Sequence, residues 1–204
     1  KRHVPFVEQD DLDLEGLTVR ETLAFSARLR LPAASLKEKL ERVDETLKLL
    51  RLESCAETPV GGVGGKTISG GERKRLMVGQ EMLTRPRLLC CDEPTSGLDS
   101  ATACVVVEAL RDLARERRVA VVASIHQPSS RLFLLFDELL LLRKGGLTYR
   151  GSTADAGDDA GNAIDPIVAR FLNCVFLTMR PVKSTQASEI FSHMELTGGR
   201  SNTP

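Results

Sequence analysis

Hydrophobic residues recur along the chain in spacings that predict different elements. Within residues 36–50 the apolar positions alternate between steps of four and three, which predicts an amphipathic helix with one apolar stripe formed by Leu36, Leu40, Val43, Leu47 and Leu50. Residues 88–91 and 119–125 are short, nearly continuous apolar runs, typical of buried parallel strands. Residues 138–142 and 147–150 flank a Lys-Gly-Gly turn and predict a β-hairpin. Helices that alternate with buried strands indicate the α/β fold class.

Polar residues mark where the helices begin. A serine or threonine followed three positions later by glutamate is the capping-box pattern, because each side chain can bond the other residue's backbone N–H. The pattern occurs in three pairs, Thr18 with Glu21, Ser35 with Glu38, and Ser69 with Glu72. The first helix should end near Arg30 and the third near Leu83. A fourth helix, over residues 101–117, follows Asp99 and Ser100.

The third helix start and the strand after it carry the candidate chemistry. Gly70 and Gly71 have no Cβ, so an anion can approach the free N–H groups of this helix start, and the helix dipole favours it. The strand at 88–91 leads directly into Asp92 and Glu93. Ligands of open α/β sheets bind at the carboxyl ends of the strands, where these two carboxylates lie.

Two adjacent carboxylates at a strand end meet the two needs of phosphoryl transfer to water. One can hold a Mg²⁺ ion, and the other can act as a base that orients the attacking water. Combined with a phosphate-facing helix start, they predict a nucleoside triphosphatase.

Four segments resemble the motifs of ATP-binding cassette (ABC) proteins. I-S-G-G-E-R-K-R at 68–75 is similar to their signature sequence, L-L-C-C-D-E-P at 88–94 to their Walker B strand, and S-G-L-D at 96–99 to their D-loop. With I-H-Q-P-S-S at 125–130, these forms most resemble the G subfamily of half-transporters, which includes the white-type pigment and sterol exporters. The resemblance runs from about residue 6 to residue 151.

The resemblance implies a parallel-sheet, P-loop-NTPase-like ABC ATPase core with a helical subdomain, present in part. We expect a partial nucleotide-binding domain at residues 1–151. Within it, residues 18–84 would form the helical subdomain with the signature helix, and residues 85–151 would contribute the Walker B, D-loop and H-loop half of the core. Residues 152–204 should be a divergent, partly disordered tail, with one amphipathic helix over 164–180.

A glycine-rich stretch at residues 60–67, V-G-G-V-G-G-K-T, ends like a Walker A motif. That motif requires glycine at the first position, where this chain has Val60, and it follows a buried strand, whereas this stretch follows a helix. We therefore interpret it as the lead-in to the signature. The family's Walker A should lie before Lys1, so we expect a fragment lacking Walker A and the transmembrane domain, which alone binds ATP poorly.

Two cassettes of this family enclose two ATP molecules head to tail, and the resemblance assigns the nucleotide contacts. The implied ATP-binding residues are Gln9, Ser69, Gly70, Gly71, Glu72 and Asp99. Of these, Ser69, Gly70 and Gly71 would clasp the γ-phosphate of the nucleotide held by the opposite cassette. Asp99 would couple the two sites across the dimer.

The remaining roles concern the metal and the chemistry. By resemblance, Gln9 of the Q-loop and Asp92 would hold Mg²⁺. Glu93 would polarise the attacking water, and His126 of the H-loop would stabilise the γ-phosphate. His126 directly follows the apolar run at 119–125, which places it at the edge of the sheet that carries Asp92.

Composition sets limits on partners and compartment. Lys plus Arg and Asp plus Glu number 28 each, so the balance gives no support for a nucleic-acid partner. The five cysteines contain no C-x-x-C pair, which favours buried thiols in a reducing compartment. No apolar run approaches the roughly twenty residues that cross a bilayer. The resemblance places the cassette on the cytoplasmic face of a membrane, with the transmembrane domain in missing sequence or in a partner.

Three functions compete. The first is the ATP-binding and ATP-hydrolysing domain of a transporter that exports a lipid or other hydrophobic compound and pairs with a second cassette as a homo- or heterodimer. The second is a soluble ABC protein of translation or DNA maintenance. Two observations argue against it: translation factors usually have N-H-L-D where residues 96–99 read S-G-L-D, and the DNA-maintenance ATPases carry long coiled coils that this sequence lacks. The third is a truncated, non-catalytic cassette that pairs with a complete ABC subunit.

Overall fold

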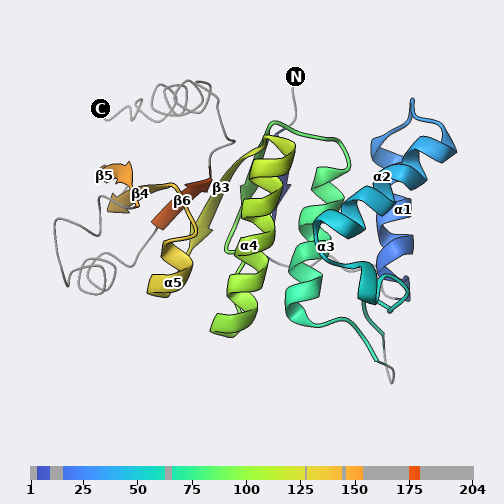
Figure 1. Ribbon diagram of the computed structural model, residues 1–204, viewed down its shortest axis with the longest axis horizontal. Coiled ribbons are helices and arrows are strands. Elements are labelled where there is room, and N and C mark those ends of the chain that lie inside the picture. The colour runs from blue at the N-terminus through green and yellow to red at the C-terminus, as the bar shows by residue number, and fades with distance from the viewer. Residues whose placement is uncertain are drawn as a thin grey trace, which may run out of the picture.

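One mixed sheet and five α-helices make up the described part of the chain (Figure 1). The computed structural model describes residues 4–9, 16–62, 66–126, 128–143, 146–153 and 175–179. The strands are β1 Phe6–Val7, β2 Leu88–Cys91, β3 Ala120–Ile125, β4 Glu138–Arg143, β5 Gly146–Ser152 and β6 Val175–Met179. The helices are α1 Val19–Arg30, α2 Leu36–Leu49, α3 Gly70–Met82, α4 Ser100–Arg117 and α5 Ser130–Phe133, with a 3₁₀ turn at Glu53–Cys55.

The sheet has a parallel half and an antiparallel half. Its strand order is β1-β2-β3-β6-β4-β5, and β1, β2 and β3 run parallel. The β4–β5 pair is the predicted hairpin. The parallel half of the sheet, with α3 and α4 packed beside it, is the α/β architecture expected of a P-loop-NTPase-like core (Figure 1).

The strand β6 contradicts the helix predicted over residues 164–180. Residues 175–179, V-F-L-T-M, are β-branched, aromatic and apolar, and they pair antiparallel with both β3 and β4. Pairing on both sides satisfies the backbone of this segment, so β6 joins the two halves of the sheet. The rest of the predicted helix, and most of the predicted tail, lies outside the described residues.

All three predicted capping boxes are present, at the starts of α1, α2 and α3. The apolar stripe of α2 is buried only in its second half. Val43, Leu47 and Leu50 are buried, whereas Leu36 is 57% exposed and Leu40 is 45% exposed. No other described element covers this first part of α2, although the helical period is kept.

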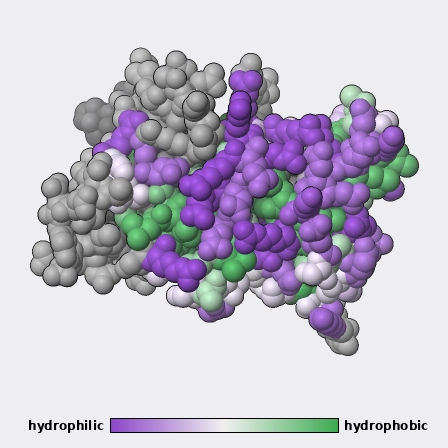
Figure 2. Space-filling view, in the orientation of Figure 1, coloured by the Kyte–Doolittle hydropathy of each residue, from purple (hydrophilic) through white to green (hydrophobic). Residues whose placement is uncertain are grey.

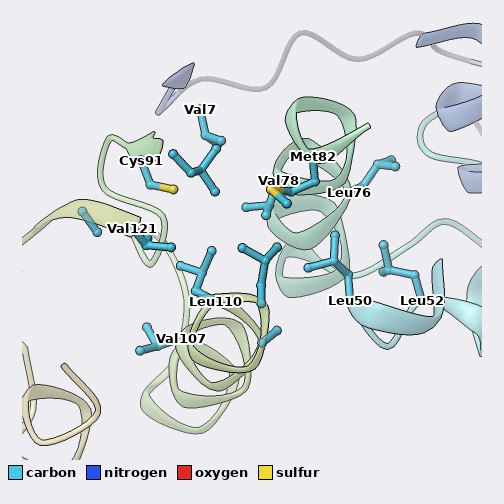
Figure 3. Packing of buried hydrophobic residues seen from close by; sticks show 14 of the residues in the cluster. Val7, Leu50, Leu52, Leu76, Val78, Met82, Cys91, Val107, Leu110 and Val121 are labelled. Carbon is cyan, nitrogen blue, oxygen red and sulfur yellow. The ribbon is translucent and has the colours of Figure 1, made fainter. Parts of the chain in front are cut away.

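The hydrophobic core joins the helices to the sheet. Figure 3 shows Val78 and Met82 of α3, Leu110 of α4 and Cys91 of β2 pointing toward a shared interior. The same cluster extends to Leu50 and Leu52 after α2 (Figure 3). One continuous core therefore fixes where the parallel strands end relative to α3 and α4.

The face visible in Figure 2 is mostly hydrophilic. Some hydrophobic residues are exposed on it, including a group at the end where α1 and α2 lie. Among the described residues, no helix is both long and apolar enough to cross a membrane. Cys55, Cys91 and Cys104 are buried free thiols, and Cys90 is partly buried. Burial of the Cys55 thiol, together with the neighbouring Glu72 carboxylate, raises its pKa to about 11.

Candidate functional site

Two polar side chains meet where β1 and β2 end. The parallel register places Val7 opposite Cys91, so Gln9 and Glu93 each lie two residues beyond a paired position. Gln9 Nε2 donates a hydrogen bond to Glu93 Oε2 at 3.0 Å. The fold therefore brings together two predicted site residues that are 84 positions apart in the sequence.

Asp92 and Glu93 are fixed by one hydroxyl of β3. Ser124 Oγ donates to Asp92 Oδ1 at 2.5 Å and accepts the backbone N–H of Glu93 at 2.8 Å. Asp92 N also donates to Val7 O at 2.8 Å. Glu93 has φ of +41°, in the left-handed region where a residue other than glycine is uncommon. We call Gln9, Asp92, Glu93 and Ser124 the strand-end cluster.

His126 directly follows β3 by sequence. The carboxyl ends of parallel strands share one edge of a sheet, so His126 leaves the sheet on the side of the strand-end cluster. Its side chain is exposed. Of the predicted catalytic pair, Glu93 is held by hydrogen bonds and His126 is available to solvent.

A second group of predicted residues lies at the start of α3. Ser69 Oγ donates to Glu72 Oε2 at 2.8 Å, and Glu72 N donates to Ser69 Oγ at 3.3 Å. Burial is the largest single influence on Glu72 and raises its pKa, but the hydrogen bonds from Ser69, together with the Cys55 thiol and the Arg75 charge, outweigh burial and lower the pKa of Glu72. The helix start thus carries a fixed carboxylate, and the Ser69 hydroxyl is already engaged in the cap.

The glycines after Ser69 allow close packing against the neighbouring loop and helix. A Cβ on Gly71 would lie well inside van der Waals contact of Thr102 Cγ2 in α4, and a Cβ on Gly70 would lie 3.1 Å from Leu98 Cδ2. Gly71 is buried. A glycine is therefore needed at position 71 for packing within the chain. This reason is separate from the approach of an anion, which the sequence suggested.

Asp99 is the N-cap of α4. Its carboxylate accepts from Ala101 N at 2.9 Å, from Thr102 N at 3.0 Å and from Thr102 Oγ1 at 2.6 Å. The hydrogen bond from the Thr102 hydroxyl is the main reason that the pKa of Asp99 is lowered. Thr102 also faces Gly71, so the starts of α3 and α4 lie next to each other. We call the predicted site residues at these two starts, Ser69, Gly70, Gly71, Glu72 and Asp99, the helix-start cluster.

Lys74 links the two clusters. It lies in the second turn of α3, is only 7% exposed, and donates from Nζ to the backbone carbonyl of Gln9 at 2.6 Å. A buried ammonium needs such a partner, because an unpaired charge away from water is strongly unfavourable. The helix that begins at Ser69 is thereby attached to the segment that carries Gln9.

The strand-end cluster offers oxygen donors suited to Mg²⁺. Gln9 donates from its amide nitrogen to Glu93, so its amide oxygen is not used in that bond, and the bond from Ser124 to Asp92 uses only Oδ1 of the Asp92 carboxylate. The described residues contain no group of three or more His, Cys, Asp or Glu that could hold a metal by themselves. Mg²⁺ commonly takes one or two carboxylates and completes its shell with water and phosphate oxygens, so this donor set fits it.

Sequence reasoning identified the members of both clusters except Ser124, and it did not identify Lys74. A serine within the apolar run of β3, two residues before His126, was the available signal for Ser124. Lys74 gave no signal, because a lysine in G-E-R-K-R is expected to be solvated and only the packing of α3 shows that it is buried.

Comparison with known families places this geometry in context. The family model described as "ABC transporter" matches residues 1–96. That range includes Gln9, the whole of α3 and the Asp92–Glu93 pair.

Several curated proteins are similar over most of the chain. ABC transporter G family member 22 of Arabidopsis thaliana is 48% identical over 159 residues, which cover 78% of this chain and 21% of that protein. ABC transporter G family member 11 of the same plant is 46% identical over 187 residues, which cover 88% of this chain and 26% of that protein. Protein white of Drosophila melanogaster is 46% identical over 155 residues, covering 75% and 22%.

These matches show how far the similarity extends along this chain and how much of each relative it covers. The chain spans about a fifth to a quarter of the length of these relatives. A match that covers 88% of the chain necessarily extends beyond residue 151, so the similarity continues past the point where the motifs alone suggested that it stops.

Proposed function

Since the chain belongs to the G subfamily of ABC proteins as part of a nucleotide-binding domain, we propose that it hydrolyses ATP to drive transport across a membrane. The observation that carries the proposal is the hydrogen bond between Gln9 and Glu93 at the ends of two adjacent parallel strands. It holds a carboxylate where ligands of such sheets bind.

In the proposed reaction three residues of the strand-end cluster, Gln9, Asp92 and Glu93, act together with His126. Asp92, with the amide oxygen of Gln9, would hold Mg²⁺, which when bound neutralises phosphate charge. Glu93 would orient and polarise the attacking water, and the exposed side chain of His126 would stabilise the γ-phosphate. The contribution of these groups is positioning together with electrostatic stabilisation.

The helix-start cluster would serve a second nucleotide, held by an opposite cassette. The free N–H groups at the start of α3 and the helix dipole favour a γ-phosphate there. Asp99, held at the start of α4 beside this helix, would couple the two sites. This arrangement requires a second cassette, as a homo- or heterodimer.

The transported compound is proposed from the family. The resemblance to the white-type half-transporters, described above as pigment and sterol exporters, supports a lipid or other hydrophobic substrate moved by a transmembrane domain in the same or a partner polypeptide. The cassette would then lie on the cytoplasmic face of that membrane. No part of the proposal requires a nucleic acid.

The test uses the polypeptide encoded by the complete reading frame that contains residues 1–204, which we call the full-frame polypeptide. Glu93→Gln should lower its ATP hydrolysis rate by about 100-fold or more while ATP still binds, because the base is lost and the shape is kept. Glu116→Gln, an exposed change on α4, is the matched control and should keep the wild-type rate.

Equal rates for Glu93→Gln and the wild type would overturn the assignment of Glu93. A full-frame polypeptide that neither binds nor hydrolyses ATP, yet supports hydrolysis by a complete white-type cassette, would instead identify a non-catalytic partner subunit.

A further inference from the structure

Ser124 is a buried polar residue in an otherwise apolar strand. It is 8% exposed and follows Ala123, the β3 residue that pairs with Cys91 of β2. Its side chain therefore lies beside the first residues after β2, which are Asp92 and Glu93. No role was assigned to this serine by the motifs.

The direction of both hydrogen bonds of Ser124 is determined by chemistry. A hydroxyl has one hydrogen to donate and lone pairs to accept. The backbone N–H of Glu93 can only donate, so the hydroxyl accepts there, at 2.8 Å, and directs its own hydrogen to Asp92 Oδ1 at 2.5 Å. One hydroxyl thus fixes the side chain of one acidic residue and the backbone of the next.

Each bond addresses a specific problem of the site. Asp92 needs a defined orientation, and the bond to Oδ1 fixes the rotation of its carboxylate, as partners of metal-binding carboxylates commonly do. Glu93 has a left-handed backbone, φ +41°, which is unfavourable for a residue with a Cβ and persists only when its surroundings hold it. The bond from its N–H to Ser124 supplies part of that support.

We infer that Ser124 is a positioning residue of the hydrolytic site, which sets the metal-binding orientation of Asp92 and the backbone of Glu93 through one hydroxyl. The inference rests on the proposed function. Ser124 itself touches neither the metal nor the nucleotide in this role. Its removal should weaken metal binding and release the Glu93 backbone without unfolding the domain.

The variants separate hydrogen bonding from size. Ser124→Ala removes the hydroxyl, and Ser124→Cys fills a similar volume with a weak donor. Ser124→Thr keeps the hydroxyl in a strand that suits β-branched residues. Thr46→Val is the matched control, because it removes a different buried hydroxyl, which donates to Arg42 O at 2.7 Å within α2.

Two measurements on the full-frame polypeptide test the inference. Amide hydrogen exchange of the peptide containing Glu93, without nucleotide, should be faster in Ser124→Ala and Ser124→Cys and near wild type in Ser124→Thr and Thr46→Val. Titration of Mn²⁺ by electron paramagnetic resonance, with ATP present, should give about 10- to 100-fold weaker binding in the first two variants only.

Each outcome has a defined meaning. Wild-type Mn²⁺ affinity and unchanged exchange at Glu93 in Ser124→Ala would overturn the inference and leave the proposed function standing. Equal losses in Thr46→Val would also overturn it, because the effect would then be one of general stability. Absence of ATP-dependent Mn²⁺ binding by the wild type would overturn the proposed function and this inference with it.

Discussion

At Gly71 the place that a Cβ would occupy is taken by the methyl group of Thr102. The hydroxyl of the same threonine donates to Asp99 Oδ2 at 2.6 Å, so its rotamer is held by the cap of α4. The glycine and the threonine are consequently a matched pair at the contact between α3 and α4. A change at Gly71 should act first on this packing.

Gly71→Ala should lower the free energy of unfolding by about 1–3 kcal/mol, because an extra methyl group in a packed contact forces its neighbours to move. The double variant Gly71→Ala with Thr102→Ser removes the clashing methyl, keeps the hydroxyl, and should recover most of the loss. Urea denaturation followed by circular dichroism measures both. A loss that the second change fails to reduce would show that Thr102 is not the limiting contact.

At the scale of elements, the helices were the most predictable part of the structure. Three capping boxes predicted three helix starts, because the pattern needs only two residues that lie three positions apart. The structure shows both of its hydrogen bonds each time. The cap at the start of α3 differs from the others in its proposed role, since it would also face a nucleotide. Its stability contribution can be measured separately from that role.

Ser69→Ala should lower the free energy of unfolding by about 1 kcal/mol at pH 7, since it removes an N-cap hydroxyl. The pKa of Glu72 is lowered in the folded state from an ordinary value of 4.5, so its contribution is present above that pH and is lost as the pH falls through the folded pKa. The difference between Ser69→Ala and the wild type should therefore shrink below about pH 4.5. Urea titrations at pH 7 and pH 4 check this, and a constant difference would contradict it.

A bidentate ion pair joins α1 to α3. Arg30 donates from Nη1 and Nη2 to the two carboxylate oxygens of Glu81, at 2.8 and 2.5 Å. The Glu81 side chain is only 12% exposed, which reduces screening by water. Charged hydrogen bonds of this kind are shorter and stronger than neutral ones.

A double-mutant cycle with Arg30→Ala and Glu81→Ala should give a coupling energy of about 1–3 kcal/mol in thermal or urea unfolding. Arg30→Lys should recover only part of it, because an ammonium cannot form the paired contact. Lys37 and Glu41 of α2 provide the control cycle, since they are 4.0 Å apart and well exposed. We expect about 0.5 kcal/mol or less there, and similar couplings for the two pairs would contradict the account.

At the scale of the whole molecule, prediction from sequence depended on how far apart the interacting residues lie. The α/β class, the hairpin and the parallel strands followed from local patterns. The strand β6 could not be predicted in this way, because residues 175–179 become a strand only by pairing with β3 and β4. Burial of Lys74 and exposure of Leu36 likewise depend on which elements pack together, which the spacing of apolar residues does not determine.

In the candidate site, too, local motifs predicted some features, and others depended on contacts between distant residues. The motifs named Gln9, Asp92 and Glu93, and the structure supplies the contact between Gln9 and Glu93 across 84 positions. The motifs did not indicate that Ser124 bridges the two acidic residues or that Lys74 connects Gln9 to the signature helix. Such links need the register between strands and the packing of α3.

The central claim is that the strand-end cluster serves one nucleotide and the helix-start cluster serves another across a dimer. The most direct measurement is the amount of radiolabelled ATP retained by the full-frame polypeptide carrying Glu93→Gln after free nucleotide is removed. We predict that this variant retains ATP, that adding Ser69→Arg abolishes retention, and that adding Ser54→Arg at an exposed position does not. Equal retention with and without Ser69→Arg would contradict the claim.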